Sequence, residues 1–171
     1  MLALLWPVPV SLAQETEENL VRISLNIFPK LVAVDLGMKD KLTSQGEILL
    51  QVYYRKKEEL ARQVVSSLEE KYSKIATYPV RVEAIDQLTS ITPTAILVVE
   101  HLPDSTIKKL IAYGIQNHIL LFSPFKEDVD RGITAGMYMA IRILPYFNRE
   151  TLNQSGIQMH QIIMRSARIY E

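Results

Sequence analysis

The residues that could carry chemistry in this sequence are three histidines, two acidic pairs and one serine at the end of an apolar run. His101, His118 and His160 lie far apart and lack the spacing of metal ligands. Ser123 lacks the flanking glycines that expose a nucleophilic serine on a sharp turn. The pairs Glu58-Glu59 and Glu69-Glu70 fall on the water-facing side of an expected helix, without the buried setting that acid catalysis uses. We therefore expect no catalytic residue and no metal site.

Cofactor and nucleic-acid chemistry also lack their usual sequence patterns. No glycine-rich phosphate loop follows any expected strand, so no nucleotide cofactor is expected. The 171 residues contain no cysteine, which excludes disulfides, thiolate nucleophiles and zinc–thiolate sites. Lys and Arg number 19 and so do Asp and Glu, so no summed positive charge would attract nucleic acid.

The segment around which the fold is expected to form is the apolar run Ala95–Val99. It lies between Pro93 and the turn His101-Leu102-Pro103, and it is rich in β-branched residues. A strand with one face in water alternates apolar and polar residues, and this run does not alternate. It is therefore expected to be a central strand covered on both faces.

The remaining patterns predict an α/β fold: a three-layer, Rossmann-like domain with a mostly parallel sheet and a C-terminal antiparallel hairpin. One such domain is expected over residues 14–171. The expected helices are 16–34, ending at Gly37, then 56–76, 103–117 and an interrupted helical region over 148–170. The expected strands are 47–54, 80–85, 94–100, 118–123, 133–139 and 142–147, of which 80–85 alternates and should lie near an edge.

Polar side chains gather where the expected parallel strands end. In open α/β sheets, ligands bind at the carboxyl ends of the strands. The sequence therefore predicts a candidate ligand crevice, with ordinary loop polarity as the alternative. Its residues would be Tyr54, Arg55, Glu100, His101 and Ser123.

The opening helix has a second apolar stripe. A helix that is apolar nearly all round is either buried in the core or shared with a partner. The stripe is a candidate interface, with plain core burial as the alternative, and Pro29 should kink or split the helix. The candidate interface residues are Leu20, Val21, Leu25, Phe28 and Val32.

The N-terminus has the pattern of a secretory signal peptide, although no Lys or Arg precedes the apolar run. Leu2–Val10 is apolar, and Ser11 and Ala13 place small residues before a cut at Gln14. The run is shorter than the roughly 20 apolar residues of a transmembrane helix. We expect residues 1–13 to be a cleaved leader; the alternatives are an apolar chain end or a core helix, against which Pro7 and Pro9 argue.

The C-terminal third contains Ile143-Leu144-Pro145-Tyr146-Phe147-Asn148, then Leu152, then Ser155-Gly156-Ile157, then Ile163-Met164-Arg165-Ser166-Ala167-Arg168. This series resembles the closing block of the YfiR/HmsC-like family. Upstream, the order of expected elements is similar as well. The sequence departs from the family in its opening, where Phe28-Pro29 stands in place of a Trp-Pro, and in lacking the cysteines that some members pair.

The resemblance implies a periplasmic, non-enzymatic regulatory protein. Such a protein binds and restrains the sensor part of an inner-membrane signalling protein, a diguanylate cyclase or sensor kinase, in cyclic-di-GMP and biofilm signalling. It also implies a homodimer. The alternative that the strand-end crevice suggests is a periplasmic small-molecule-binding module related to transporter substrate-binding proteins, although two lobes usually make such a binder and this chain is long enough for one.

Overall fold

The computed structural model describes residues 10–171, with side chains from Thr16 onward. Of the predicted leader, residues 1–9 lie outside the described residues, and residues 10–13 form the first turn of a helix. None of the helices within residues 10–171 has both the length and the apolar character needed to cross a membrane.

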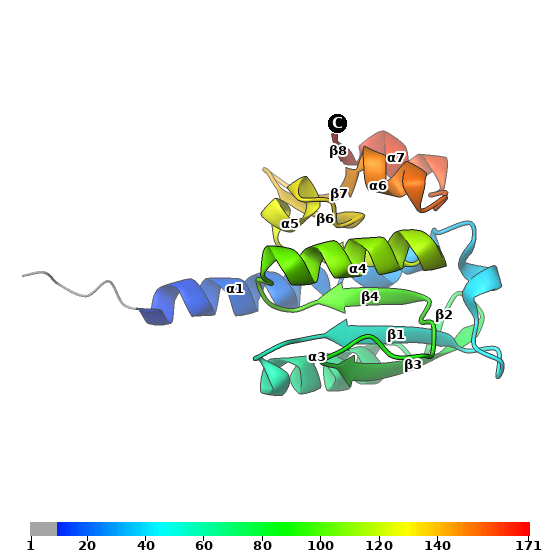
Figure 1. The fold of residues 1–171 in the computed structure, drawn as a ribbon, viewed down its shortest axis with the longest axis horizontal. Helices are drawn as coiled ribbons and strands as arrows, with labels where there is room; N and C mark the ends of the chain where they lie inside the picture. Colours follow the sequence, from blue (N-terminus) through cyan, green and yellow to red (C-terminus); the bar gives the residue numbers. More distant parts are fainter. Residues whose placement is uncertain (1–9) are drawn as a thin grey trace, which may run out of the picture.

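The molecule is organised around one eight-stranded sheet in the order β2-β3-β1-β4-β5-β6-β7-β8 (Figure 1). The five strands from β3 to β6 are parallel, β6 and β7 form an antiparallel hairpin, and β8 returns parallel to β7. This confirms the predicted mostly parallel sheet with a C-terminal hairpin. The strands are β1 Ile48–Tyr53, β2 Lys74–Ile75, β3 Tyr78–Ile85, β4 Ala95–Val98, β5 Leu120–Ser123, β6 Ala135–Met139, β7 Ile143–Asn148 and β8 Arg168–Tyr170.

Helices cover both faces of the sheet. On one face α1, α2 and α3 pack on alternate residues of β1, β4 and β5. On the other face the apolar side of α4 covers the intervening residues, which gives the three predicted layers. The helices are α1 Val10–Ser24, α2 Phe28–Ala33, α3 Glu58–Lys71, α4 Asp104–Asn117, α5 Lys126–Asp130, α6 Arg149–Gln154 and α7 Gln161–Ser166, with a 3-10 turn η1 at Met38–Lys41.

Strand β4 is the predicted central strand. It lies between β1 and β5, with Ala95 opposite both Leu50 and Leu120. Every residue of β4 is buried, because helices on both faces exclude water from a strand that has no polar face to present.

The opening helix is split, as Pro29 predicted. Chain turns at residues 25–27 separate α1 from α2, and Pro29 lies in the first turn of α2, where its missing N–H costs no hydrogen bond. The candidate interface is wrong for four of its residues: Val21, Leu25, Phe28 and Val32 are buried in the chain's own core, and Leu20 packs against that core from a half-buried position.

Other boundaries differ because local patterns do not report pairing between distant segments. The helix predicted over residues 56–76 is α3, and it ends at Lys71. It stops there because Lys74 and Ile75 pair antiparallel with the start of β3. The last predicted helical region ends at Ser166, and Arg168–Tyr170 instead extends the sheet beside β7. Gly37 does not end a helix with a left-handed cap; it precedes η1 with φ −89°.

Candidate functional site

The predicted crevice residues all lie at the carboxyl edge of the sheet, where β1, β4 and β5 end. Tyr54 and Arg55 follow β1, Glu100 and His101 follow β4, and Ser123 ends β5. Since these strands are parallel neighbours, their ends must meet, and the sequence placed this edge correctly. However, most of these side chains make hydrogen bonds or are buried, so they do not line one open crevice.

Glu100 is the residue that ties this edge together. Its carboxylate oxygen Oε1 accepts hydrogen bonds from the backbone N–H groups of Arg55, Lys56 and Lys57, at 2.6, 2.8 and 3.0 Å. These N–H groups precede helix α3, where the aligned peptide dipoles favour negative charge. Burial by itself raises the pKa of Glu100, but the three backbone donors and the Lys57 charge outweigh it, so the pKa is lowered and the group is an anion.

Helix α1 joins the two loops at this edge through Glu17. One carboxylate oxygen of Glu17 lies 2.9 Å from the Lys57 ammonium, and the other lies 3.7 Å from the His101 ring. The His101 ring stacks on Phe125, with 4.0 Å between the ring centroids. Sequence reasoning missed Glu17 and Lys57, because a carboxylate in an expected opening helix gives no sign of which distant loop it meets.

Ser123 does not open onto this edge. Its side chain is fully buried, donates a 2.6 Å hydrogen bond to Asp128 and accepts one from the Phe125 N–H. Asp128 is also buried and pairs with Arg131, which reaches Asp104 at 2.6 Å. Ser123 therefore belongs to a closed structural network, and its place in the predicted crevice is wrong.

Tyr54 lines a hollow whose other lining residues include none of the predicted crevice residues. The hollow is shallow, with a volume of about 410 Å³, and it is also lined by Glu58 and Arg62 of α3 and Ala84 of β3. Of the five predicted residues, the structure therefore brings together Arg55 and Glu100, and it leaves His101 close by on the Glu17 side.

A larger open cleft lies beside the Glu100 contact, between α1 and the start of α3. Its volume is about 630 Å³, and charged side chains of both signs line it, including Glu18, Lys56, Lys57 and Glu59. Several of the lining side chains also pair within the chain: Glu58 with Arg62 at 2.6 Å, Lys57 with Glu17 at 2.9 Å, and Glu59 with the Gln63 amide at 3.4 Å. Such a surface suits a small ligand that carries both charges. In the part of the chain from Thr16 onward, no group of three or more His, Asp or Glu is placed to hold a metal ion.

No protein-family model matches this sequence, and no curated protein sequence matches it either. Two solved structures are similar. A conserved domain protein from Vibrio cholerae superimposes with a TM-score of 0.62 at 14% identity, over 86% of this chain and 60% of that one. A Streptococcus pneumonia structure, described as the ABC domain in complex with L-Trp, superimposes with a TM-score of 0.53 at 12% identity, over 82% of this chain and 62% of that one.

These likenesses concern the fold. Both identities are low, and the chain spans about three fifths of the length of each similar structure. The arrangement of helices on a mostly parallel sheet is thus one that this chain shares with both of these structures.

Proposed function

We propose that this chain is a binding module for a small zwitterionic molecule of the amino-acid type, held in the cleft between α1 and the start of α3. The observation that carries the proposal is the mixed charge of that cleft at the carboxyl edge of the sheet. A ligand ammonium group would face Glu59, and a ligand carboxylate would face Lys56, since Lys57 already pairs with Glu17.

The electrostatics of the edge support a ligand with both charges over a simple anion. Glu100 already occupies the backbone N–H groups that would otherwise attract a phosphate or carboxylate. The likeness in fold to a protein described in complex with L-Trp supports an amino acid as the first class of ligand to try. The proposal assigns binding, not catalysis, to this site.

The test is a thermal unfolding series with L-tryptophan, tryptamine and indole-3-propionate at constant ionic strength. Tryptamine lacks the carboxylate, and indole-3-propionate lacks the ammonium group. The proposal therefore expects L-tryptophan, and not these two analogues, to raise the melting temperature. Other zwitterionic amino acids are tested in the same way. A ligand at 100 times its Kd stabilises the folded state by about 2.7 kcal/mol.

The variant Lys56→Gln should weaken this effect, because it removes a cation that lines the cleft. Lys108→Gln is the matched control, since Lys108 is an exposed lysine on α4, outside the cleft. If no amino acid raises the melting temperature, or if both variants respond alike, the proposal fails.

A second candidate function is the regulatory one that the C-terminal resemblance implies, with a protein as the partner. The observation that favours it is the tip of the β6–β7 hairpin, where Met139, Ile141 and Ile143 are exposed large apolar side chains. Exposed apolar residues that cluster in this way are typical of contact surfaces. The proposed partner is the periplasmic part of an inner-membrane diguanylate cyclase or sensor kinase.

A photo-crosslinking residue in place of Ile141 tests this second candidate in cells that make the protein. The expected product joins the chain to such a sensor protein, identified by mass spectrometry, and the same probe at exposed Lys108 should give no such product. The homodimer is tested by light scattering, which should give twice the chain mass. Periplasmic export is tested by N-terminal sequencing of protein made with its native leader: the expected first residue is Gln14, and an intact Met1 would contradict export.

A further inference from the structure

A second cavity lies at the opposite edge of the sheet, where the parallel strands begin. Its volume is about 390 Å³, and four segments that are distant in sequence converge on it: η1, the approach to β4, the α4–β5 turn and the α6–α7 turn. Leu42 and Ile157 give it apolar walls, while Asp40, Asn117 and His118 give it polar ones. Neither the predicted crevice nor the proposed cleft includes this cavity.

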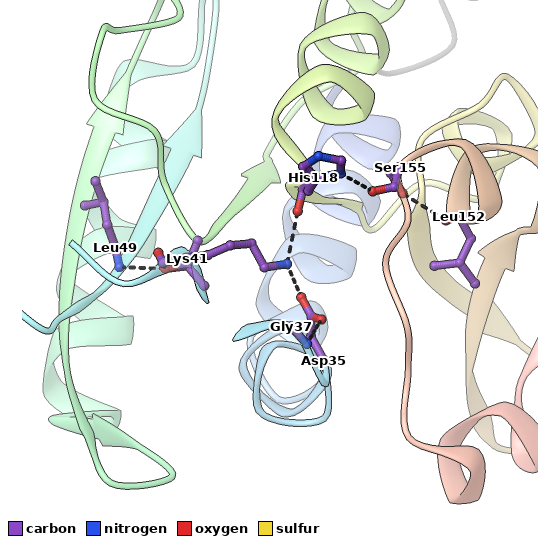
Figure 2. Close-up of polar contacts among 8 residues, drawn as sticks. Asp35, Gly37, Lys41, Leu49, His118, Leu152 and Ser155 are labelled. Carbon is purple, nitrogen blue, oxygen red and sulfur yellow. Dashed lines mark hydrogen bonds and ion pairs between the residues drawn. The ribbon is translucent and has the colours of Figure 1, made fainter. Parts of the chain in front are cut away.

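The Lys41 and Asn117 side chains at this cavity already donate hydrogen bonds within the chain, while the Thr92 hydroxyl donates to no described residue. The Lys41 ammonium group pairs with Asp35 and donates to the backbone carbonyl of His118 at 3.0 Å (Figure 2). The side chains of Lys41 and Asp35 are only 10% and 2% exposed, so the pair is buried and its charges cancel. The Asn117 amide nitrogen donates to the Tyr113 carbonyl at 2.9 Å.

The acceptors around the cavity are not used in the same way. Nδ1 of His118 lies 2.7 Å from the Ser155 carbonyl oxygen (Figure 2), and because a carbonyl can only accept, Nδ1 carries the hydrogen. In the tautomer with its hydrogen on Nδ1, Nε2 is an acceptor, and no residue from Thr16 to Glu171 donates a hydrogen bond to it. Within the same residues, the Asp40 carboxylate and the Asn117 amide oxygen receive no side-chain or backbone hydrogen bond. The residues that line the cavity therefore include three acceptors without a donor in the described chain and one carboxylate, that of Asp40, without an ion-pair partner.

We propose that this cavity binds the primary ammonium group of a small alkylamine, with the hydrocarbon part of the ligand against Leu42 and Ile157. An ammonium group has three donor hydrogens and no acceptor, which matches the three open acceptors of Asp40, Asn117 and His118. The negative charge of Asp40 should favour an alkylammonium ion over an alkyl carboxylate with a hydrocarbon chain of similar length. This site is independent of the amino-acid cleft at the carboxyl edge.

The experiment is a titration of ¹⁵N-labelled protein with n-butylammonium chloride, followed by two-dimensional amide spectra. Gly37 and Gly156 line the cavity, whereas Gly46 and Gly136 do not, so the chain carries its own reporters and controls. The expected result is a saturable shift of the Gly37 and Gly156 amides with n-butylammonium and no such shift with sodium butyrate or sodium chloride at equal ionic strength.

Two variants and one control complete the test. Asp40→Asn should weaken n-butylammonium binding about tenfold, and Asp40 is exposed, so the fold should be retained. His118→Asn should also weaken binding, because it removes Nε2 and keeps a residue type that tolerates the left-handed conformation observed at φ 58°. Asp86→Asn, at an exposed aspartate that follows β3 at the other edge, should bind as the parent does. No saturable shift in the parent, an equal shift with butyrate, or unchanged binding by Asp40→Asn would each overturn the proposal.

Discussion

The Glu100 carboxylate accepts a 2.6 Å hydrogen bond from the backbone N–H of Arg55, across 45 residues of sequence. The same oxygen also holds the N–H groups of Lys56 and Lys57, so one side chain after β4 satisfies the backbone donors that open α3. This contact joins the two loops that form the carboxyl edge of the sheet. It also explains why an acidic residue is buried there without a side-chain cation bonded directly to it.

Glu100→Gln should destabilise the fold by about 1–3 kcal/mol, because a charge-assisted acceptor is replaced by a neutral one. The pKa of Glu100 is lowered in the folded state from its ordinary value of 4.5. Its contribution is therefore present above pH 4.5 and is lost as the pH falls through the lowered folded pKa. Urea unfolding of parent and variant across the acidic range should show the difference between them shrinking at low pH. Glu59→Gln, at an exposed position on α3, is the control, and a difference that does not depend on pH would contradict this role.

Lys41→Met should cost about 3–5 kcal/mol, because it leaves the Asp35 carboxylate buried without its cation. The double variant Asp35→Asn with Lys41→Met should recover much of that loss, since neither side chain then carries a buried charge. Denaturant unfolding of the single and double variants measures both effects. Equal losses in the two would mean that packing of the Lys41 chain, and not the unpaired charge, sets the cost.

Ser123→Ala should lower the free energy of unfolding by about 2 kcal/mol, because Asp128 loses one of the hydrogen bonds that it accepts in a buried position. The same variant should bind a cleft ligand as the parent does, since Ser123 is fully buried. Urea unfolding and the thermal series with L-tryptophan separate these two effects. A changed response to the ligand in Ser123→Ala would place this serine back in the site.

Phe28→Ala should destabilise the fold by about 3–5 kcal/mol, because it removes a fully buried ring that lies 5.5 Å from the Phe122 ring, centroid to centroid. Its oligomeric state should remain that of the parent, because Phe28 faces the chain's own core. Calorimetry and light scattering on the same samples test the two parts. A change in oligomeric state with little loss of stability would restore the interface hypothesis for α2.

Much of the fold could be predicted because burial on both faces leaves a clear pattern. The run Ala95–Val99 has no polar face, and this alone indicates a central strand between helical layers. By contrast, Arg168–Tyr170 has two exposed side chains of three and no strand pattern of its own. It becomes a strand only because it lies beside β7, and sequence periodicity does not report such pairing.

The candidate site shows the same division between local and distant information. The rule that ligand sites lie where parallel strands end placed Glu100 and Arg55 at one edge, and the structure brings them into contact. The rule could not show that Glu100 would accept hydrogen bonds from the backbone N–H groups at that edge. It also could not show that Ser123 would be buried in a hydrogen bond to Asp128. Both facts depend on side-chain directions that are fixed only when the whole sheet has formed.

The place of β8 beside β7 has a consequence for biosynthesis. Since Arg168–Tyr170 supplies the outermost strand on that side, the sheet cannot be completed on the ribosome until residue 170 has left the exit tunnel. Until then the backbone groups of β7 that later bond to β8 remain open to other chains. A nascent chain stalled before residue 168 should therefore be a better substrate for chaperones than the released protein.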